Sequence, residues 1–317
     1  MHNGYVWKPG DGIEPEALHR LRDHFGRPKA AMGEAWFMGE DRRHFPELMG
    51  DLDALGVDAL LRPLGEIASG TGSFGQRREW HDWFHYLLAQ RVTDDREWVG
   101  ETLTELLVTG FMAHYADGVA SPPYPGFARD VLATLGRTLM EPRYWQEGDI
   151  VVGRLLHRSN HNPNQVWCWW DASGDLSAAL MLCAKYLPAS QVGGWFRSVL
   201  AIESPHWRAQ MIVWLIGAHD LLTGLKHAPS ELDSAAYPAI TWGWSHSLRA
   251  STTTEAGEVI PVADWLPQAA RTQLLDEVRA CFTDEVFVAW LESIGRVDYL
   301  QRELADLPST FERLYMR

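Results

Sequence analysis

Cysteine is scarce in this sequence, and its few positions argue against a disulfide framework. The chain of 317 residues contains only Cys168, Cys183 and Cys281. An odd number of cysteines without C-x-x-C spacing is typical neither of a disulfide-stapled domain nor of a zinc knuckle. Because free thiols persist in reducing compartments, we expect a cytoplasmic protein.

Long apolar segments are also missing, which argues against a membrane protein. The longest apolar run, Met211–Ala218, is too short to span a bilayer. The first residues of the chain lack the apolar core of a signal peptide. With 46% hydrophobic and 22% charged residues, the chain has the composition of an ordinary globular domain.

Positive charge is in deficit. The chain has 42 acidic and 28 basic residues, which gives a formal net charge of −14 at pH 7. Phosphate binding needs a positive surface, so we do not expect nucleic acid as a partner. An acidic surface attracts basic molecules, and the expected partner is therefore a basic protein.

Familiar cofactor and nucleophile motifs are absent from the sequence. It contains no G-x-S-x-G elbow, Walker A loop, EF-hand loop or paired cysteine–histidine signature. Gly70–Gly75 matches G-x-G-x-x-G, but the preceding Leu60–Ala68 has a helical pattern, whereas the dinucleotide fingerprint requires a strand there. We predict a loop between helices at Gly70–Gly75, and no cofactor.

Helical periodicity dominates what is present. Apolar residues recur at i, i+3, i+4 and i+7 through Glu79–Arg91, which predicts an amphipathic helix. Similar patterns predict helices at 97–115, 127–140, 176–187, 191–202, 205–222, 268–282, 284–294 and 297–304. Short links between them favour stacked helical hairpins in a single helical domain over residues 1–317. This mainly α fold is an α-solenoid of HEAT type or an irregular helical array, with an (α/α) toroid as the alternative.

Two long stretches, 141–174 and 223–267, interrupt the helical pattern. In the second, apolar and polar residues alternate through Ile240–Leu248, which predicts a β-strand. The polar turn Thr252–Glu258 and the segment Val259–Val262 would complete one small β-hairpin insertion. We expect the aromatic face of this hairpin to pack on the helix Pro205–Leu222, because a two-stranded hairpin is only marginally stable alone.

Tryptophan is abundant, and the two interruptions carry the candidate functional residues. The chain has 16 tryptophans, most of which we assign to the core because they are spread along its length. The candidate ligand- or partner-binding tryptophans lie in the interruptions, at Trp169, Trp170, Trp242 and Trp244. Histidines and an aspartate beside them form the candidate catalytic set of an enzyme interpretation, namely His157, His161, Asp171 and His246.

His81 and His85 are the weak candidates for a metal site. Two histidines at i and i+4 on a helix can share a metal ion. However, the helical pattern places them about 90° and 130° from the centre of the apolar stripe, near the solvent face. A hairpin that turns near Asp94 would leave His114 about 10 Å beyond His81 along the helix axis. We therefore expect solvated histidines and no bound metal.

The leading functional hypothesis is a non-catalytic binding protein. Stacked helices build rigid surfaces, and an acidic one complements a basic partner, as in an immunity-type protein that neutralises a bacterial toxin. The alternative is an (α/α)-toroid enzyme that acts on a saccharide or another polar small molecule. Convergence of the two long interruptions on one site would favour the enzyme.

Overall fold

The computed structural model describes residues 4–35, 44–94, 96, 103–151, 171–232, 238–253, 259–261, 264–297, 300, 305 and 307–316. For residues 171–172, 252–253 and 259–261 it describes the backbone alone. Helices make up most of this structure, and none of them is both long enough and apolar enough to cross a membrane. The predicted fold class, a mainly helical protein with a small β-hairpin, is confirmed.

The described residues of the first part of the chain form five α-helices and four short 3₁₀ turns. The α-helices are α1 (Pro15–His24), α2 (Val57–Phe74), α3 (Arg78–Arg91), α4 (Leu103–His114) and α5 (Phe127–Ala133). The 3₁₀ turns are η1 (Pro46–Met49), η2 (Leu52–Ala54), η3 (Leu135–Met140) and η4 (Pro142–Tyr144). A small antiparallel hairpin, β1 (Trp145–Gln146) with β2 (Asp149–Ile150), follows.

The second part continues with longer helices and two further strand pairs. The helices are α6 (Gly174–Tyr186), α7 (Ala189–Leu200), α8 (Pro205–Thr223), η5 (Pro229–Glu231), η6 (Ser245–Ser247), α9 (Gln268–Cys281), α10 (Asp284–Gly295) and α12 (Leu307–Tyr315). The strand β3 (Asp171–Ala172) pairs in parallel with β4 (Ala239–Ile240). The strand β5 (Ser251–Thr253) pairs in antiparallel fashion with β6 (Val259–Pro261).

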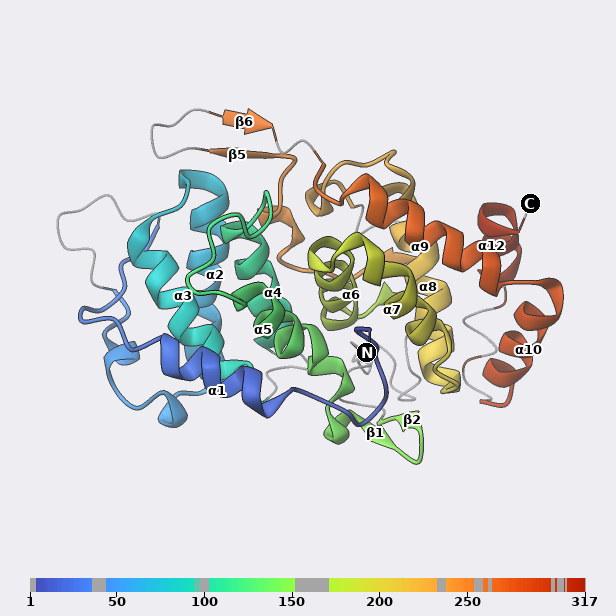
Figure 1. Ribbon diagram of the computed structural model, residues 1–317, viewed down its shortest axis with the longest axis horizontal. Helices are drawn as coiled ribbons and strands as arrows, with labels where there is room; N and C mark the ends of the chain where they lie inside the picture. The colour runs from blue at the N-terminus through green and yellow to red at the C-terminus, as the bar shows by residue number, and fades with distance from the viewer. Residues whose placement is uncertain are drawn as a thin grey trace, which may run out of the picture.

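The helices form two adjoining groups along the long axis of the molecule (Figure 1). Helices α1 to α5 make one group, α6 to α9 make the other, and α10 and α12 extend the second group at its far end. One continuous hydrophobic core runs through both groups, from Trp7 to Tyr315. Helices α4 and α6 are buried on nearly every face, so they lie at the centre of this core.

Local sequence signals define the ends of the central helices. Ser204 caps α8, since its hydroxyl accepts a hydrogen bond from Trp207 N, and Pro205 occupies the first turn. Gly224 ends α8 with a left-handed φ of 83°, a conformation that glycine adopts readily. Ser173 caps α6, because its hydroxyl accepts a hydrogen bond from Leu176 N.

Most tryptophans that the structure describes are buried, as predicted. Trp7 is 2% exposed and lies edge-on against Trp195 and Trp207, with ring centroids 5.5 and 6.2 Å away. Its indole N–H donates to the Gly136 carbonyl at 2.9 Å. The N-terminal segment therefore ties η3 in one helical group to α7 and α8 in the other.

Two local predictions are wrong. Gly70–Phe74 belongs to α2 rather than to a loop, and only Gly75 lies beyond the helix end. A side chain at Gly70 would meet Trp80, so close packing accounts for this glycine. The predicted strand Ile240–Leu248 is also wrong, since β4 ends at Ile240 and the chain then turns into η6. Alternation alone did not reveal that Trp242 N bonds back to the Ile240 carbonyl and starts a turn.

The hairpin forms from a shorter pair of strands and packs elsewhere than expected. Its strands are β5 and β6, and its turn residues 254–258 lie outside the described residues. The strand β5 packs on α2, whereas β4 packs on α8, so the expected contact of the hairpin with α8 is wrong. Figure 1 shows the hairpin at the edge of the molecule beside α2.

Candidate functional site

The first long interruption is held at both ends by α8. Residues 152–170 lie outside the described residues, but β2 precedes them and β3 follows them. Both strands pack on α8. His206 and Gln210 lie one helical turn apart on α8. His206 bonds Asp149 in β2, and Gln210 bonds Ser173 just after β3. We call the two bonds together the loop clamp.

The entry side of the loop clamp is a carboxylate held by two side chains. Asp149 Oδ2 lies 2.8 Å from His206 Nδ1, and Ser204 donates its hydroxyl to Asp149 Oδ1. Burial raises the pKa of Asp149, but the hydrogen bonds from His206 and Ser204 outweigh it and hold the pKa below its usual range. Because the carboxylate separates the hydroxyl from the imidazole, these residues do not form a Ser–His–Asp nucleophile.

The exit side brings the two long interruptions together. Ser173 N donates to Gln210 Oε1 at 3.1 Å. Just before it, Asp171 pairs with Ala239 and Ala172 with Ile240 in the parallel β3–β4 ladder. Ile240 packs on Gly217 of α8, where a side chain would meet it at 3.2 Å. The stretches 141–174 and 223–267 therefore meet on one face of α8.

Two carboxylates lie at this junction, on the first turns of α4 and α6. Asp175, 3% exposed, accepts a hydrogen bond from Glu105 N at 3.0 Å. Glu105 in turn accepts from Trp244 N at 3.0 Å. The positive end of a helix dipole favours negative charge at such positions. The junction thus combines the carboxylates of Glu105 and Asp175 with the half-buried indole of Trp244 and the imidazole of His246 beside it. Such groups bind polar ligands and exchange protons.

The predicted site residues that the structure describes differ in how far they are exposed. Trp242 is 4% exposed and donates its indole N–H to Thr109 Oγ1 at 2.9 Å, so it belongs to the core. Trp244 is half-buried, and its ring centroid lies 5.7 Å from that of the exposed His246. The backbone of Asp171 lies at the junction. The remaining predicted residues, His157, His161, Trp169 and Trp170, lie outside the described residues.

Sequence reasoning missed Glu105, Asp175 and Gln210. A signal existed for the first two, because each is a lone carboxylate in the first turn of an otherwise apolar helix. A buried carboxylate needs a partner, so an acidic residue in such a helix indicates a polar contact. Gln210 carried no comparable signal, since glutamine on a long helix is usually solvated.

Gly174 is a sensitive test of this junction. A side chain at Gly174 would collide with Glu105 Oε2 and would lie 2.5 Å from the Thr241 carbonyl oxygen. We expect Gly174→Ala to lower the free energy of unfolding by about 1–3 kcal/mol, measured by urea denaturation. Gly194→Ala, which meets nothing within 4 Å, should have little effect or stabilise. Equal stability of the two variants would contradict the close packing at the junction.

The prediction that His81 and His85 are solvated is wrong. His85 is 3% exposed, and its ring lies 4.2 Å from that of His81 between centroids. His114 lies 4.9 Å from His81, not about 10 Å beyond it. His81 is ten residues before the end of α3, and His114 is eleven residues after the start of the described α4, so both lie at the same level. The error came from placing the turn near Asp94.

Burial keeps this histidine cluster, made of His81, His85 and His114, neutral. Desolvation, with added repulsion from neighbouring histidines, lowers the pKa of His85 to about 3 and that of His114 well below its usual value. Desolvation also lowers the pKa of His81. Neither ring nitrogen of His114 has a hydrogen-bond partner among the residues that the structure describes. His24, His81 and His85 line an open cavity of about 420 Å³, but among the described residues no three histidine, cysteine or acidic side chains are placed to hold a metal ion.

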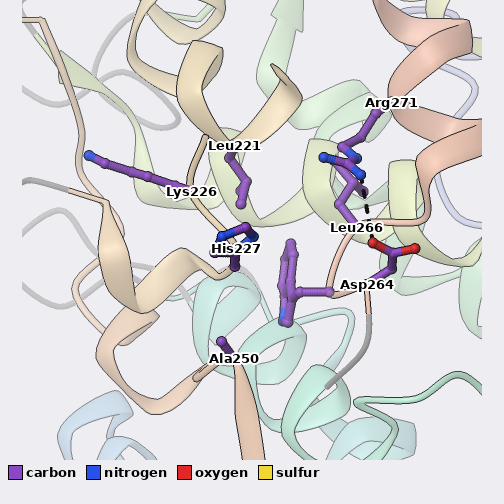
Figure 2. Close-up of a pocket in the computed structure, with 8 residues that line it drawn as sticks. Leu221, Lys226, His227, Ala250, Asp264, Leu266 and Arg271 are labelled. Atoms are coloured by element: carbon purple, nitrogen blue, oxygen red, sulfur yellow. Dashed lines mark ion pairs between the residues drawn. The ribbon is translucent and has the colours of Figure 1, made fainter. Parts of the chain in front are cut away.

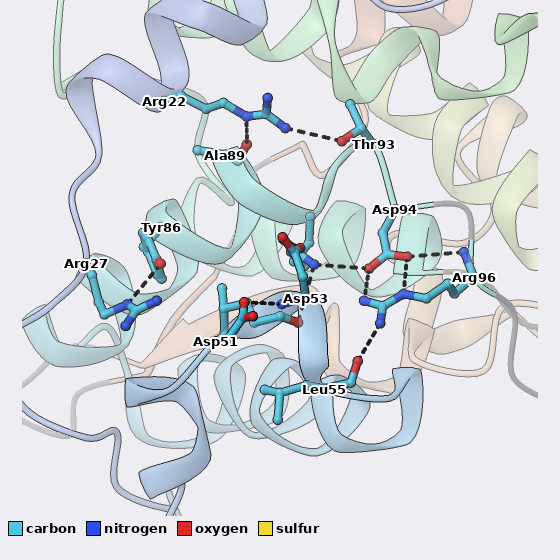
Figure 3. A network of polar contacts seen from close by, with 12 residues as sticks. Arg22, Arg27, Asp51, Asp53, Leu55, Tyr86, Ala89, Thr93, Asp94 and Arg96 are labelled. Atoms are coloured by element: carbon cyan, nitrogen blue, oxygen red, sulfur yellow. Dashed lines mark hydrogen bonds and ion pairs between the residues drawn. The ribbon is translucent and has the colours of Figure 1, made fainter.

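Asp94 is the centre of a polar network (Figure 3). It accepts from Arg96 Nε at 2.8 Å and pairs with Arg91 at 3.6 Å. Arg22 joins the network through Thr93, at 3.3 Å. Burial raises the pKa of Asp94, but its contacts with Arg96 and Arg91 hold it below the usual range. These contacts neutralise Asp94, and the network serves to tie α1, η2 and α3 together.

The loop clamp and the carboxylates beside it are thus the strongest candidate functional site among the described residues. They come from α4, α6, α8 and both long interruptions. A site assembled from several distant segments is typical of ligand-binding and catalytic centres. Comparison of the chain with protein-family models, with curated proteins and with solved structures finds no match.

Proposed function

We propose that the chain is an enzyme that binds a polar small molecule of the saccharide class at the loop clamp. The observation that carries the proposal is the β3–β4 pairing, which joins the two long interruptions on α8. Long connections between the helices of a compact domain are often functional. Both of these loops are anchored next to the same carboxylates, where a bound ligand would meet groups from each.

The chemistry of the junction fits a sugar-like ligand better than an apolar one. Glu105 and Asp175 accept hydrogen bonds from backbone N–H groups and are oriented by them. A carboxylate oriented in this way can also accept from ligand hydroxyls or transfer a proton. Trp244 and His246 supply flat rings, and an indole face packs well against the apolar side of a sugar ring.

The experiment is a screen of the wild-type chain against an oligosaccharide microarray, with product analysis for each oligosaccharide bound. We expect His246→Ala to weaken binding or turnover about tenfold without changing the melting temperature. His246 is exposed, and the only described hydrogen bond of its ring goes to the Gly243 carbonyl. His19→Ala, on the exposed face of α1, is the matched control. Absence of any bound oligosaccharide and of any product would refute the proposal.

A second candidate function is the binding of a basic protein, and α10 favours it. Val288 on this helix is 52% exposed, one of few large apolar side chains so exposed on the described surface. The exposed acids Asp284, Glu285 and Glu292 surround it, and within the described part of the chain they form no ion pair. An apolar residue inside an acidic rim complements a basic partner, including the toxin of an immunity-type pair.

This second function predicts a charge-dependent complex. The double variant Glu285→Lys, Glu292→Lys should lose a basic protein that wild type retains stoichiometrically from native lysate. Because both side chains are exposed, the melting temperature should stay the same. The control is Asp51→Lys, Asp58→Lys, two exposed acids in the other helical group. Retention of the same protein by both double variants would exclude the α10 surface.

A further inference from the structure

A small cavity lies at the opposite end of α8 from the loop clamp (Figure 2). Its volume is about 150 Å³, room for about five water molecules at ~30 Å³ each. It is formed by the end of α8 and the residues that follow it, by Ala250 before β5, by the segment before α9 and by the first turn of α9. The lining residues are Leu221, Lys226, His227, Ala250, Asp264, Trp265, Leu266 and Arg271.

Arg271 in this cavity is a largely buried cation whose side chain makes no hydrogen bond to any described residue. Its side chain is only 20% exposed, and its Nε is fully buried without a partner. Its one ion pair in the described structure joins Nη2 to Asp264 Oδ1 at 3.6 Å, beyond hydrogen-bond range, and Asp264 is 57% exposed. A guanidinium has five N–H donors, and burial of the Nε–H without a partner is unfavourable.

The other walls define what this guanidinium can bind. Leu221, Leu266 and Trp265 are each at most 3% exposed and supply an apolar lining. The Lys185 ammonium donates a hydrogen bond to the Trp265 carbonyl and lies 4.9 Å from the Trp265 ring centroid. These two contacts hold Trp265 in place as a wall of the cavity. Lys226 is held by Asp220 at 3.8 Å, and its side chain extends away from the cavity in Figure 2. Of the described lysine and arginine side chains that line the cavity, Arg271 is therefore the one available to a ligand.

We propose that this cavity is a binding site for a small organic monocarboxylate. Both oxygens of the carboxylate would accept hydrogen bonds from the guanidinium of Arg271, whose planar pair of N–H donors matches that geometry. A short aliphatic tail would pack on Leu221, Leu266 and Trp265. A phosphate dianion fits less well, because the carboxylate of Asp264 lies beside the cation and the walls are apolar. This site does not depend on the function proposed for the loop clamp.

The test is isothermal titration of the whole chain with propionate, at ionic strength matched with sodium chloride. Wild type should bind propionate saturably with a stoichiometry of one, and inorganic phosphate should bind at least tenfold more weakly. Arg271→Gln should lower propionate affinity at least tenfold. Asp264→Asn should raise it severalfold, because it removes the carboxylate that competes for the cation.

A matched control is present on the same helix. Arg279 forms an ion pair with Asp276 at the same 3.6 Å, but both side chains are 62% exposed. Arg279→Gln should bind propionate as wild type does. The site is disproved if propionate binding does not saturate, if phosphate binds equally well, or if Asp264→Asn weakens binding. The Asp264→Asn result decides the matter even if Arg271→Gln fails to fold.

Discussion

Between pH 7.5 and pH 5 the protein will lose much of its stability, because its histidine cluster is buried in the neutral form. The folded state lowers the pKa of His81, His85 and His114, whereas the unfolded chain restores values near 6.5. Unfolding therefore takes up protons below pH 6.5. The full stability is present above that pH and declines as the pH falls.

The size of this effect follows from His85. One histidine that stays neutral when folded removes about 1.4 kcal/mol per pH unit below its unfolded pKa. With the folded pKa of His85 at about 3, the loss reaches about 2 kcal/mol by pH 5 from this residue alone. His81 and His114 add to it in the same direction. Carboxylates such as Asp94 and Asp149 lose their stabilising charge only at lower pH, nearer their own ordinary pKa.

The measurement is urea denaturation from pH 7.5 to pH 5, on wild type and two variants. His114→Leu removes an imidazole that makes no hydrogen bond, so its stability at pH 7.5 should be maintained or raised and its pH dependence should be shallower. His19→Gln removes an exposed histidine and should follow the wild-type curve. A wild-type stability that stays constant from pH 7.5 to pH 5 would contradict the neutral cluster.

Trp242→Ala should destabilise the protein by about 3–5 kcal/mol, the loss typical of truncating a buried aromatic side chain. Trp242 is 4% exposed, and its indole N–H bonds Thr109 in the middle of α4. The variant would leave a cavity and would remove the hydrogen bond that Thr109 Oγ1 accepts, although this hydroxyl would still donate to the Glu105 carbonyl. Thermal and urea denaturation measure the effect.

Trp242→Phe separates the two contributions, because it keeps most of the volume but loses the N–H donor. We expect it to cost about 1–2 kcal/mol, less than the alanine variant. The opposite outcome is an unchanged melting temperature for Trp242→Ala together with loss of ligand binding. That result would place Trp242 in a binding surface and remove it from the core.

Helices were predictable from this sequence because their signals are local. The apolar stripe of Glu79–Arg91 corresponds to α3, and Ser204 with Pro205 marks the start of α8. Such patterns act over one or two turns, so neighbouring residues contain the information. Local signals were weaker for strands. The alternation at Ile240–Leu248 arises from a turn followed by η6, and Trp242 and Trp244 before η6 both bond α4, at Thr109 and Glu105.

The candidate site could be predicted only in part. Asp171, Trp244 and His246 were recognised because polar and aromatic residues cluster in the two interruptions. Their partners Glu105 and Gln210 lie far away in the chain, and nothing local connects them. The loop clamp exists because residues 149, 173 and 206–210 converge on α8 in three dimensions.

By itself, the sequence determined a mainly helical, acidic chain with a tryptophan-rich core. Charge and tryptophan content follow from composition, and helical periodicity follows from residues that are neighbours in the chain. The tertiary structure alone decided which segments meet. It placed His114 beside His81, joined β3 to β4, and left Nε of Arg271 buried without a hydrogen-bond partner in the described structure. Each of these depends on the length of a connection and on packing between segments distant in sequence, and neither is encoded in a local pattern.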